Sequence, residues 1–315
     1  MNLVSIPENP VPEGAIVGVL KTPDGVNLRF ARWAPPRGRK GTVCILPGRT
    51  EFIEKYFEVV RDLRARGFAV AIFDWRGQGL SDRALRDPRK GHVRSFAEFD
   101  LDLETFAKEI LLPDCPPPFF ALAHSMGGAV LLRAAHRNRR WFDRAVLSSP
   151  MVALIGRPAL RYGRPLIRLA RLFGFGRAYV PGGGATAFQS MPFAGNPVTS
   201  DPLRYARTAA IVEAEPKLGL GAPTIAWADA AFSAMREFED PQYGARMFQP
   251  ILIIAAGADE IVSTPAASKL AAGLRAGSQL VIAGSRHEPM MEQDRYREQF
   301  WAAFDAFIPG SPLFK

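Results

Sequence analysis

Short apolar runs alternate along this chain with longer stretches in which apolar residues recur every three or four positions. The short runs are typical of buried parallel strands, and they cover residues 42–46, 68–75, 116–124, 144–150, 250–262 and 279–284. The longer stretches are typical of amphipathic helices, and they cover residues 51–67, 95–112, 126–137 and 295–307, with a further helix from Thr264. This alternation predicts parallel β-α-β units, and therefore an α/β fold whose mostly parallel sheet is flanked by helices.

Two parts of the chain depart from this rhythm. Residues 15–35 form two apolar stretches around a Pro-Asp-Gly sequence, which predicts an antiparallel hairpin turned at that sequence. Residues 151–247 are rich in glycine, proline, phenylalanine and arginine and lack the strand pattern. We therefore expect an α/β core formed by residues 1–150 and 248–315, with residues 151–247 inserted as a mainly helical cap.

The composition is that of a globular protein, since 48% of the 315 residues are apolar and 23% are charged. The N-terminal residues lack a basic segment followed by a long apolar run, and no apolar run reaches the length of a membrane span. We therefore predict neither a signal peptide nor a spanning helix, and a cytoplasmic location. Cys44 and Cys115 lack metal-ligand spacing, and we expect no disulfide between them.

The sequence ALAHSMGG, residues 121–128, places Ser125 between a predicted strand and a predicted helix. A sharp turn of this kind lifts a serine hydroxyl above the sheet, and it admits only small residues two positions before and after the serine. Ala123 and Gly127 occupy those positions, so Ser125 is a candidate nucleophile. A serine that precedes a helix is often an N-cap instead, and its partners have to decide between the two roles.

A serine nucleophile needs a base, and a carboxylate that orients the base. Among the four histidines, His124 neighbours the serine on a strand and points to the other face, and His136 lies at the far end of the following helix. His287, just past the last predicted strand, is the predicted base. Asp259, on the loop after a preceding strand, is the predicted carboxylate, with Glu260 as its alternative.

Two further motifs follow predicted strands: LPGRTEFIEKY at residues 46–56 and DWRGQGLSD at residues 74–82. With the serine turn and the late aspartate and histidine, they resemble the monoacylglycerol lipase and bacterial lysophospholipase branch of the α/β-hydrolases, which is also similar to the serine aminopeptidases. The resemblance implies an α/β-hydrolase fold and a serine hydrolase that requires no metal and no organic cofactor. The chain order Ser125, Asp259, His287 is the order expected of that fold.

In that family the loop after the early strand commonly reads His-Gly-x-Gly-Glu, and the amide of the x residue contributes to the oxyanion hole. Residues 47–51 read Pro-Gly-Arg-Thr-Glu here, so the resemblance implies the amides of Arg49 and Met126 as oxyanion donors. The Arg49 side chain either pairs with Glu51 or Glu54 and holds the loop, or meets an anionic headgroup such as phosphate. We favour the ion pair.

The inserted segment contributes much of the formal net charge of +9, because residues 151–200 contain no aspartate or glutamate. Five arginines fall on one arc of a predicted helix there: Arg157, Arg161, Arg164, Arg168 and Arg171. One interpretation is a basic amphipathic helix in peripheral contact with an anionic membrane. The other, which we favour, is a helix kinked at Pro165 with a solvated arginine face. We expect no nucleic-acid partner, since no nucleic-acid module accompanies the charge.

Several aromatic and thioether side chains of this segment are candidates for the wall of an acyl-chain tunnel, or for the core of the cap: Phe188, Met191, Phe193 and Trp227. An aminopeptidase would need carboxylates for the amino group of its substrate, and the first half of the segment has none. We therefore predict hydrolysis of carboxylic esters of single-chain lipids, monoacylglycerol or lysophospholipid, through an acyl-enzyme. The alternatives are an aminopeptidase or small-ester hydrolase, and a ligand-binding receptor on the same fold.

Overall fold

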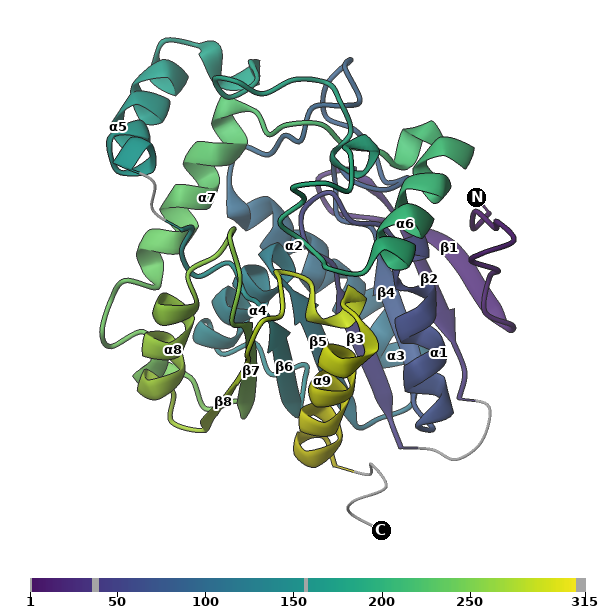
Figure 1. Ribbon diagram of the computed structural model, residues 1–315. Helices are drawn as coiled ribbons and strands as arrows, with labels where there is room; N and C mark the ends of the chain where they lie inside the picture. Colours follow the sequence, from purple (N-terminus) through teal and green to yellow (C-terminus); the bar gives the residue numbers. More distant parts are fainter. Residues whose placement is uncertain (1, 36–39, 156–157, 310–315) are drawn as a thin grey trace.

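The computed structural model describes residues 2–35, 40–155 and 158–309, with the backbone alone for residues 158–162. Within these residues the strands form one sheet of eight, in the order β1-β2-β4-β3-β5-β6-β7-β8 (Figure 1). The strands are β1 (Ala15–Lys21), β2 (Asn27–Trp33), β3 (Thr42–Leu46), β4 (Ala69–Phe73), β5 (Phe119–His124), β6 (Arg144–Ser148), β7 (Ile251–Ala256) and β8 (Gly277–Ile282). Helices cover both faces of the sheet, as the sequence pattern predicts.

The sheet is parallel throughout β3 to β8 and antiparallel at β1 and β2. β1 and β2 form the predicted hairpin, with Ala15 opposite Trp33. Every residue of β3 and β4 is buried, which explains why these strands occur in the sequence as unbroken apolar runs. Because the parallel strands share one direction, the loops after β3, β5, β7 and β8 all leave from one edge of the sheet.

Two apolar clusters join the helices to opposite faces of the sheet, and neighbouring β3 residues alternate between them. α1 (Phe57–Ala65) and α9 (Asp294–Phe307) pack on the face that contains Val43. α2 (Phe96–Phe106), α4 (Met126–His136) and α8 (Thr264–Gly273) pack on the face that contains Cys44. These helices therefore hold the strand ends, and the loops that follow them, in fixed positions.

Two predicted helices begin or continue in other helical forms. A 3₁₀ turn (Ile53–Tyr56) precedes α1. α2 begins as expected at Ser95, whose side chain accepts a hydrogen bond from the Ala97 amide, and it continues through a π turn (Ala107–Leu111) into α3 (Leu112–Asp114).

The segment between β6 and β7 contains α5 (Pro158–Leu172), α6 (Pro202–Ala214) and α7 (Ile225–Glu237), and it covers the edge of the sheet from which those loops leave (Figure 1). α7 packs against α2, and its Trp227 and Met235 belong to the same apolar cluster as α2. The division into a core of residues 1–150 and 248–315 and a cap of residues 151–247 remains a prediction, because part of the segment shares the core of the sheet.

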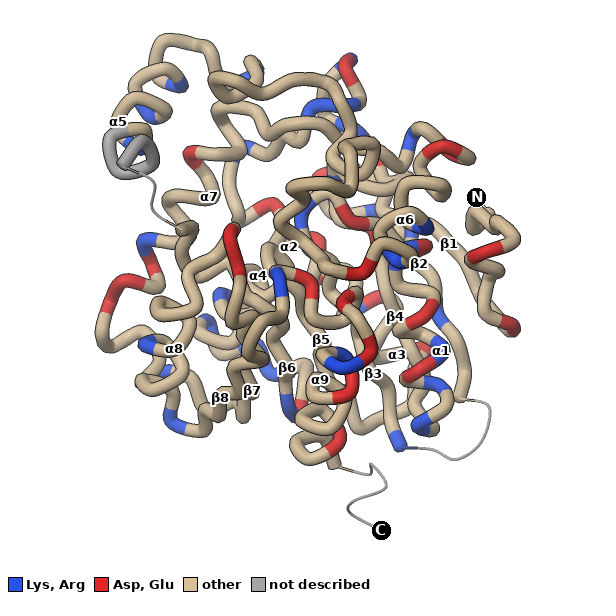
Figure 2. Tube along the Cα trace, in the orientation of Figure 1, with Lys and Arg blue, Asp and Glu red and all other residues tan. Residues whose placement is uncertain are grey.

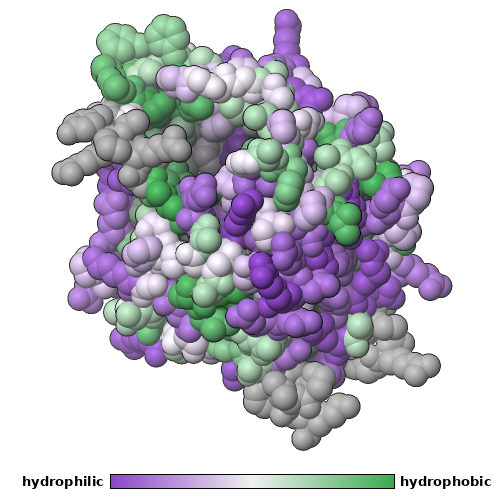
Figure 3. Space-filling model, viewed as in Figure 1, coloured by the Kyte–Doolittle hydropathy of each residue, from purple (hydrophilic) through white to green (hydrophobic). Residues whose placement is uncertain are grey.

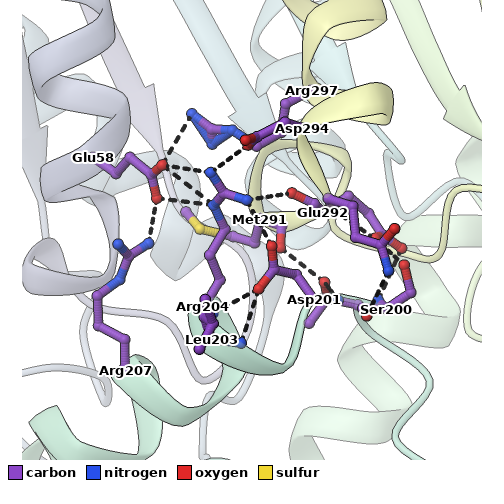
Figure 4. Close-up of polar contacts among 12 residues, drawn as sticks. Glu58, Ser200, Asp201, Leu203, Arg204, Arg207, Met291, Glu292, Asp294 and Arg297 are labelled. Carbon is purple, nitrogen blue, oxygen red and sulfur yellow. Dashed lines mark hydrogen bonds and ion pairs between the residues drawn. The ribbon is translucent and has the colours of Figure 1, made fainter.

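Ion pairs connect α6 to α1 and α9, the helices on the face of the sheet that contains Val43 (Figure 4). Arg204 pairs with Glu58 of α1 and with Asp294 of α9, each at 2.7 Å. Arg207, one turn further along α6, also pairs with Glu58. Arg204 donates a further hydrogen bond to the backbone oxygen of Glu292, at 2.9 Å. This part of the β6–β7 segment is therefore fixed to two helices at once.

Two arginines of α5 depart from the expected solvated face. Arg164 pairs with Glu239 at 3.0 Å, and Arg171 pairs with Asp229 of α7 at 2.6 Å. The prediction is wrong for these two residues, because α5 packs on α7 and directs them towards carboxylates of α7 and of the turn that follows it. Arg168 is exposed, as predicted.

The remaining predicted features of α5 are Pro165, Arg157 and Arg161. The helix continues through Pro165. Arg157 and the side chain of Arg161 lie outside the described residues. Large apolar side chains of α5 and the turn after it are exposed, and they gather at one end of the molecule (Figure 3): Leu166, Leu169, Leu172, Phe173 and Phe175.

A buried arginine joins the outer strands to the loop of residues 74–82. The Arg29 side chain on β2 is fully buried; its Nε donates to Asp74 at 2.7 Å, and its terminal nitrogens donate to Glu54 at 2.7 and 2.8 Å. Asp74 also accepts hydrogen bonds from the amides of Ile53 and Leu80. The polar residues around Asp74 therefore have a structural role beside the predicted site.

We predict that Arg29→Ala lowers the free energy of unfolding by about 3–5 kcal/mol, because it leaves two buried carboxylates without their counter-charge. Urea denaturation measures this change. Arg94→Ala is the control, since the Arg94 side chain is 78% exposed in its pair with Glu98. This control should change stability by less than about 1 kcal/mol. Equal effects of the two substitutions would contradict the assigned role of Arg29.

Candidate active site

The turn between β5 and α4 gives Ser125 a backbone conformation that is rare for an L-residue, with φ of 48° and ψ of −111°. The Ser125 backbone amide donates to the backbone oxygen of Ser148 at 3.0 Å. The backbone oxygen of Ser125 accepts from the Met151 amide at 2.9 Å. The Ser125 side chain makes no capping hydrogen bond to α4, although it occupies the N-cap position. The hydroxyl is therefore available to another partner.

That partner is His287, whose Nε2 lies 3.0 Å from the Ser125 hydroxyl oxygen. The opposite ring nitrogen, Nδ1, lies 2.8 Å from Oδ2 of Asp259. With Nδ1–H donating to Asp259, Nε2 of His287 can accept the Ser125 proton, which is the arrangement of a serine nucleophile with its base. Glu260, the alternative carboxylate, is exposed.

Asp259 is held by the backbone that follows it. Its Oδ1 accepts hydrogen bonds from the amides of Ile261 at 2.8 Å and Val262 at 2.9 Å. Burial raises the pKa of Asp259, but its hydrogen bond with His287 and the two amides outweigh burial, and the pKa lies below its ordinary value. Asp259 is therefore ionised at neutral pH and can stabilise a protonated His287.

A second buried histidine, which the sequence patterns did not indicate, supports the loop of His287. His124 Nε2 lies 3.2 Å from the backbone oxygen of His287, and its Nδ1 lies 3.2 Å from Glu51. Burial lowers the pKa of His124, but the Glu51 carboxylate raises it further than burial lowers it. Glu51 also accepts from Lys55 at 2.8 Å and from the Tyr56 hydroxyl at 2.6 Å. As predicted, His124 does not contact the Ser125 hydroxyl among the described hydrogen bonds.

The two candidate oxyanion amides belong to Arg49, in the loop after β3, and to Met126, the first residue of α4. Among the described hydrogen bonds, neither the Arg49 amide nor the Met126 amide donates to a protein acceptor. In the Arg49 loop, the amides on either side are occupied: that of Gly48 donates to Glu51, and that of Thr50 donates to Gln78. Thr50 has a φ of 67°, so it adopts here the left-handed conformation that glycine favours.

The Arg49 side chain makes neither of the ion pairs that we favoured from the sequence. Its Nη2 donates to the backbone oxygen of Gly221 at 2.6 Å, and its guanidinium carbon lies 5.2 Å from the ring centroid of Trp227. The prediction is wrong because Glu51 is held by Lys55 and His124, and Glu54 by Arg29. Burial lowers the pKa of Arg49 to about 10, so the side chain remains charged at neutral pH.

A cavity of about 240 Å³ opens beside Ser125 and His287. Its apolar wall comes from the ends of β6 and β7 and from the β6–β7 segment: Met151, Leu154, Phe188, Val198, Pro223, Trp227, Ile261 and Val262. Of the predicted tunnel residues, Phe188 and Trp227 belong to this wall. Met191 and Phe193 do not, because the chain after Phe188 packs on α6, where Tyr205 donates to the Met191 oxygen and contacts the Phe193 ring.

The sequence patterns did not predict most of these wall residues. A signal was available for Ile261 and Val262, which lie two and three positions after Asp259, the predicted carboxylate. Cys44 and Cys115 are buried free thiols. Within the described part of the chain, no group of three or more His, Cys, Asp or Glu side chains could hold a metal ion. The cavity therefore combines a serine hydrogen-bonded to His287 with an apolar wall.

The fold and the serine, histidine and aspartate on its strand-end loops define a serine hydrolase of the α/β-hydrolase class. The model of one family, described as "Serine aminopeptidase, S33", matches residues 37–294. The chain belongs to this family. It is 32% identical over 283 residues to lysophospholipase L2 of Escherichia coli, covering 87% of this chain and 82% of that protein. It is 28% identical over 274 residues to the probable lysophospholipase L2 of Haemophilus influenzae, covering 87% and 85%.

Solved structures agree with the fold. A soluble variant of monoglyceride lipase from Saccharomyces cerevisiae, in complex with a substrate analog, superposes with a TM-score of 0.73 at 18% identity, covering 94% of this chain and 96% of that one. A thermostable carboxyl esterase from Bacillus coagulans superposes with a TM-score of 0.74 at 20% identity, covering 95% and 99%. At these identities the likeness concerns the arrangement of the backbone.

We predict that Gly127→Ala lowers kcat/KM for a short chromogenic ester by about 100-fold, the effect of misplacing reacting groups by about 1 Å. A Cβ on Gly127 would lie 2.3 Å from the backbone oxygen of Leu46 and 2.7 Å from that of Pro47. Either the serine turn or the loop after β3 must therefore shift. Gly163→Ala is the matched control, because nothing described lies within 4 Å of its Cβ position. Unchanged turnover in Gly127→Ala would show that the turn tolerates the methyl group.

Proposed function

We propose that the protein hydrolyses carboxylic esters of single-chain lipids, monoacylglycerols or lysophospholipids, through an acyl-enzyme on Ser125. The observation that supports this most strongly is the hydrogen-bonded series Ser125, His287, Asp259 at the mouth of an apolar cavity. The relatives named lysophospholipase L2, which align over most of the chain, support the same substrate class.

The proposed reaction follows from the site geometry. The Ser125 hydroxyl attacks the ester carbonyl while His287 takes its proton, and Asp259 stabilises the resulting imidazolium. The carbonyl oxygen becomes an oxyanion that accepts hydrogen bonds from the amides of Arg49 and Met126, each worth about 3 kcal/mol in the transition state. His287 then gives the proton to the departing alcohol. Water, activated in turn by His287, releases the fatty acid and restores the serine.

The acidic residues of the site argue against an aminopeptidase. Glu51 and Glu288 line the cavity, but both accept from Lys55, at 2.8 and 2.6 Å. Asp229 of α7 pairs with Arg171. The described wall of the cavity therefore offers no carboxylate free of a cationic partner for the amino group of a peptide substrate.

The segment of residues 151–247 is proposed as the cap that selects the acyl chain. Phe188 and Trp227 belong to the cavity wall and come from this segment, so they are the proposed acyl contacts. Met191 is 50% exposed and Phe193 39% exposed outside that wall, and we propose no substrate contact for them.

We predict that Ser125→Ala and His287→Ala each lower kcat by several orders of magnitude while thermal unfolding is unchanged, because the two residues act as one unit. Asp259→Asn should be similarly damaging, and Glu260→Gln, at an exposed neighbouring position, is its matched control. The measurements are turnover of a lysophospholipid, a monoacylglycerol, a short ester and an aminoacyl amide, with covalent labelling by a fluorophosphonate probe.

Preferred turnover of the aminoacyl amide would favour the peptidase alternative. Rapid probe labelling without turnover of any ester would remove lipid-ester hydrolysis. Failure of the probe to label the wild-type protein would favour the ligand-binding receptor.

Peripheral contact with an anionic membrane is the second part of the proposal, and the apolar end of α5 supports it. Leu172 and Phe173 are 76% and 72% exposed, and Arg168, one helical turn before Leu172, is also exposed. Figure 2 shows basic positions along α5 without an acidic position among them. Apolar side chains that enter the interface, together with basic residues, are the usual elements of such contact.

None of the described helices is long and apolar enough to cross a membrane. The cytoplasmic location remains a prediction.

We predict that Leu172→Ser with Phe173→Ser abolishes co-sedimentation with anionic vesicles, while Arg168→Gln weakens it and reduces its dependence on salt. The apolar pair contributes burial, whereas one arginine contributes about 1 kcal/mol that salt screens. Leu203→Ser is the control, because Leu203 is 80% exposed on α6, outside the apolar end of α5. Equal sedimentation of all variants, or none of the wild-type protein, would exclude contact through α5.

A further inference from the structure

The charged side chains around the cavity beside Ser125 differ in whether they form ion pairs. Its carboxylates, Glu51 and Glu288, are each paired with Lys55. Among the described residues that line it, Arg49 is the one with a permanent positive charge. Arg49 forms no ion pair among the described residues, and the apolar wall offers its guanidinium no carboxylate in direct contact.

The Arg49 guanidinium is packed in place although most of its hydrogen-bonding capacity is unused. It lies against Gly91, where a Cβ would come within 2.9 Å of Nη2, and near the ring of Trp227. Nη2 donates to the Gly221 oxygen, whereas Nε is buried without an acceptor. No carboxylate of the described chain lies within ion-pair distance of it. A half-buried guanidinium without an ion pair, held near an aromatic ring, is suited to an oxyanion that arrives with a ligand.

The position of Arg49 relative to the ester follows from its backbone. The backbone amide of Arg49 is a proposed oxyanion donor, so in the proposed complex it lies beside the scissile carbonyl. The guanidinium of the same residue is then separated from that carbonyl by the length of one arginine side chain. In a lysophospholipid the phosphate stands at the opposite end of the glycerol from the ester. The phosphate and the guanidinium are thus both a short reach from the same carbonyl.

We propose that Arg49 reads the phosphate of the leaving group and thereby selects lysophospholipids over monoacylglycerols. This inference rests on the proposed lipid-ester hydrolysis and adds the headgroup chemistry to it. Phosphate oxygens accept from the guanidinium N–H groups that Gly221 does not use, while the contacts to Gly221 and Trp227 hold the fork in place. Monoacylglycerol offers only a hydroxyl at that position and leaves the charge uncompensated.

Binding to Ser125→Ala tests the proposal without turnover. The probes are dodecyl phosphate, 1-O-dodecylglycerol and inorganic phosphate, measured by calorimetry below their aggregation concentrations. Adding Arg49→Gln should weaken dodecyl phosphate by about 10- to 100-fold, the usual effect of losing hydrogen bonds to a charged group, and leave dodecylglycerol almost unchanged. If Arg49→Gln fails to fold, Arg49→Lys should still weaken dodecyl phosphate selectively, because lysine lacks the planar fork.

Arg83→Gln is the matched control. Arg83 also joins a core loop to the β6–β7 segment, donating to the backbone oxygens of Gly79 and Lys217 at 2.8 Å, and it is outside the cavity wall. It should leave both lipid probes unchanged. Equal weakening of the binding of both probes by Arg49→Gln would show that Arg49 has only a structural role. No weakening of either probe would exclude Arg49 from phosphate binding. Inorganic phosphate that binds as tightly as dodecyl phosphate, and depends on Arg49, would assign the site to free phosphate and overturn the lipid assignment.

Turnover separates this inference from the proposed function. For substrates with the same acyl chain, Arg49→Gln should lower the ratio of kcat/KM for lysophospholipid to that for monoacylglycerol by about 10- to 100-fold. A merely structural role would lower both values together and leave the ratio unchanged. If the wild-type protein hydrolyses neither lipid, the proposed function fails, whereas the binding measurements still decide the role of Arg49.

Discussion

Ser125 has a backbone conformation that an L-residue rarely adopts, and segments far apart in the sequence keep it there. The backbone oxygen of Ser148, at the end of β6, accepts a hydrogen bond from the Ser125 amide, and the Met151 amide donates to the backbone oxygen of Ser125. The backbone oxygens of Leu46 and Pro47 lie so close to Gly127 that a side chain there would collide with them. The same contacts that hold the serine turn also bring the Arg49 loop next to it. The nucleophile and its proposed oxyanion donors therefore share one support, which a change at any of these positions would disturb.

A second support is electrostatic. Glu51 accepts from the Gly48 amide in the oxyanion loop and approaches His124, which in turn lies within hydrogen-bond distance of the backbone of His287. The raised pKa of His124 means that its charged form is favoured in the folded protein. The stability that it contributes is fully present below the ordinary histidine pKa of 6.5 and is lost as pH rises through the higher pKa of the folded state. The loop of His287 and the loop of Arg49 are thus coupled through buried side chains.

Much of this arrangement follows from local patterns. The apolar runs of β3 and β5, the Pro-Asp-Gly hairpin and the small residues around Ser125 specify their own structure, and strand-end loops meet at one edge of a parallel sheet. The partner of Arg49 could not be predicted in this way. Its supposed partner Glu51 is held by Lys55, which also binds Glu288, more than two hundred residues away. A choice among several charges depends on the assembled neighbourhood, which spacing along the chain does not encode.

The orientation of α5 escaped prediction for the same reason, since Arg164 and Arg171 face carboxylates supplied by α7 and the turn after it. This difference in attachment has a consequence for how a lipid enters. α7 shares the apolar core of the sheet, and α6 is joined to α1 and α9 through Arg204, so displacing either helix would break core contacts or these ion pairs. Beyond its packing on α7, α5 is held to its neighbours by half-exposed ion pairs, whose loss costs little free energy. α5 is therefore less firmly attached than α6 or α7, and its exposed leucines, with the phenylalanines of the turn after it, would meet a hydrocarbon surface first.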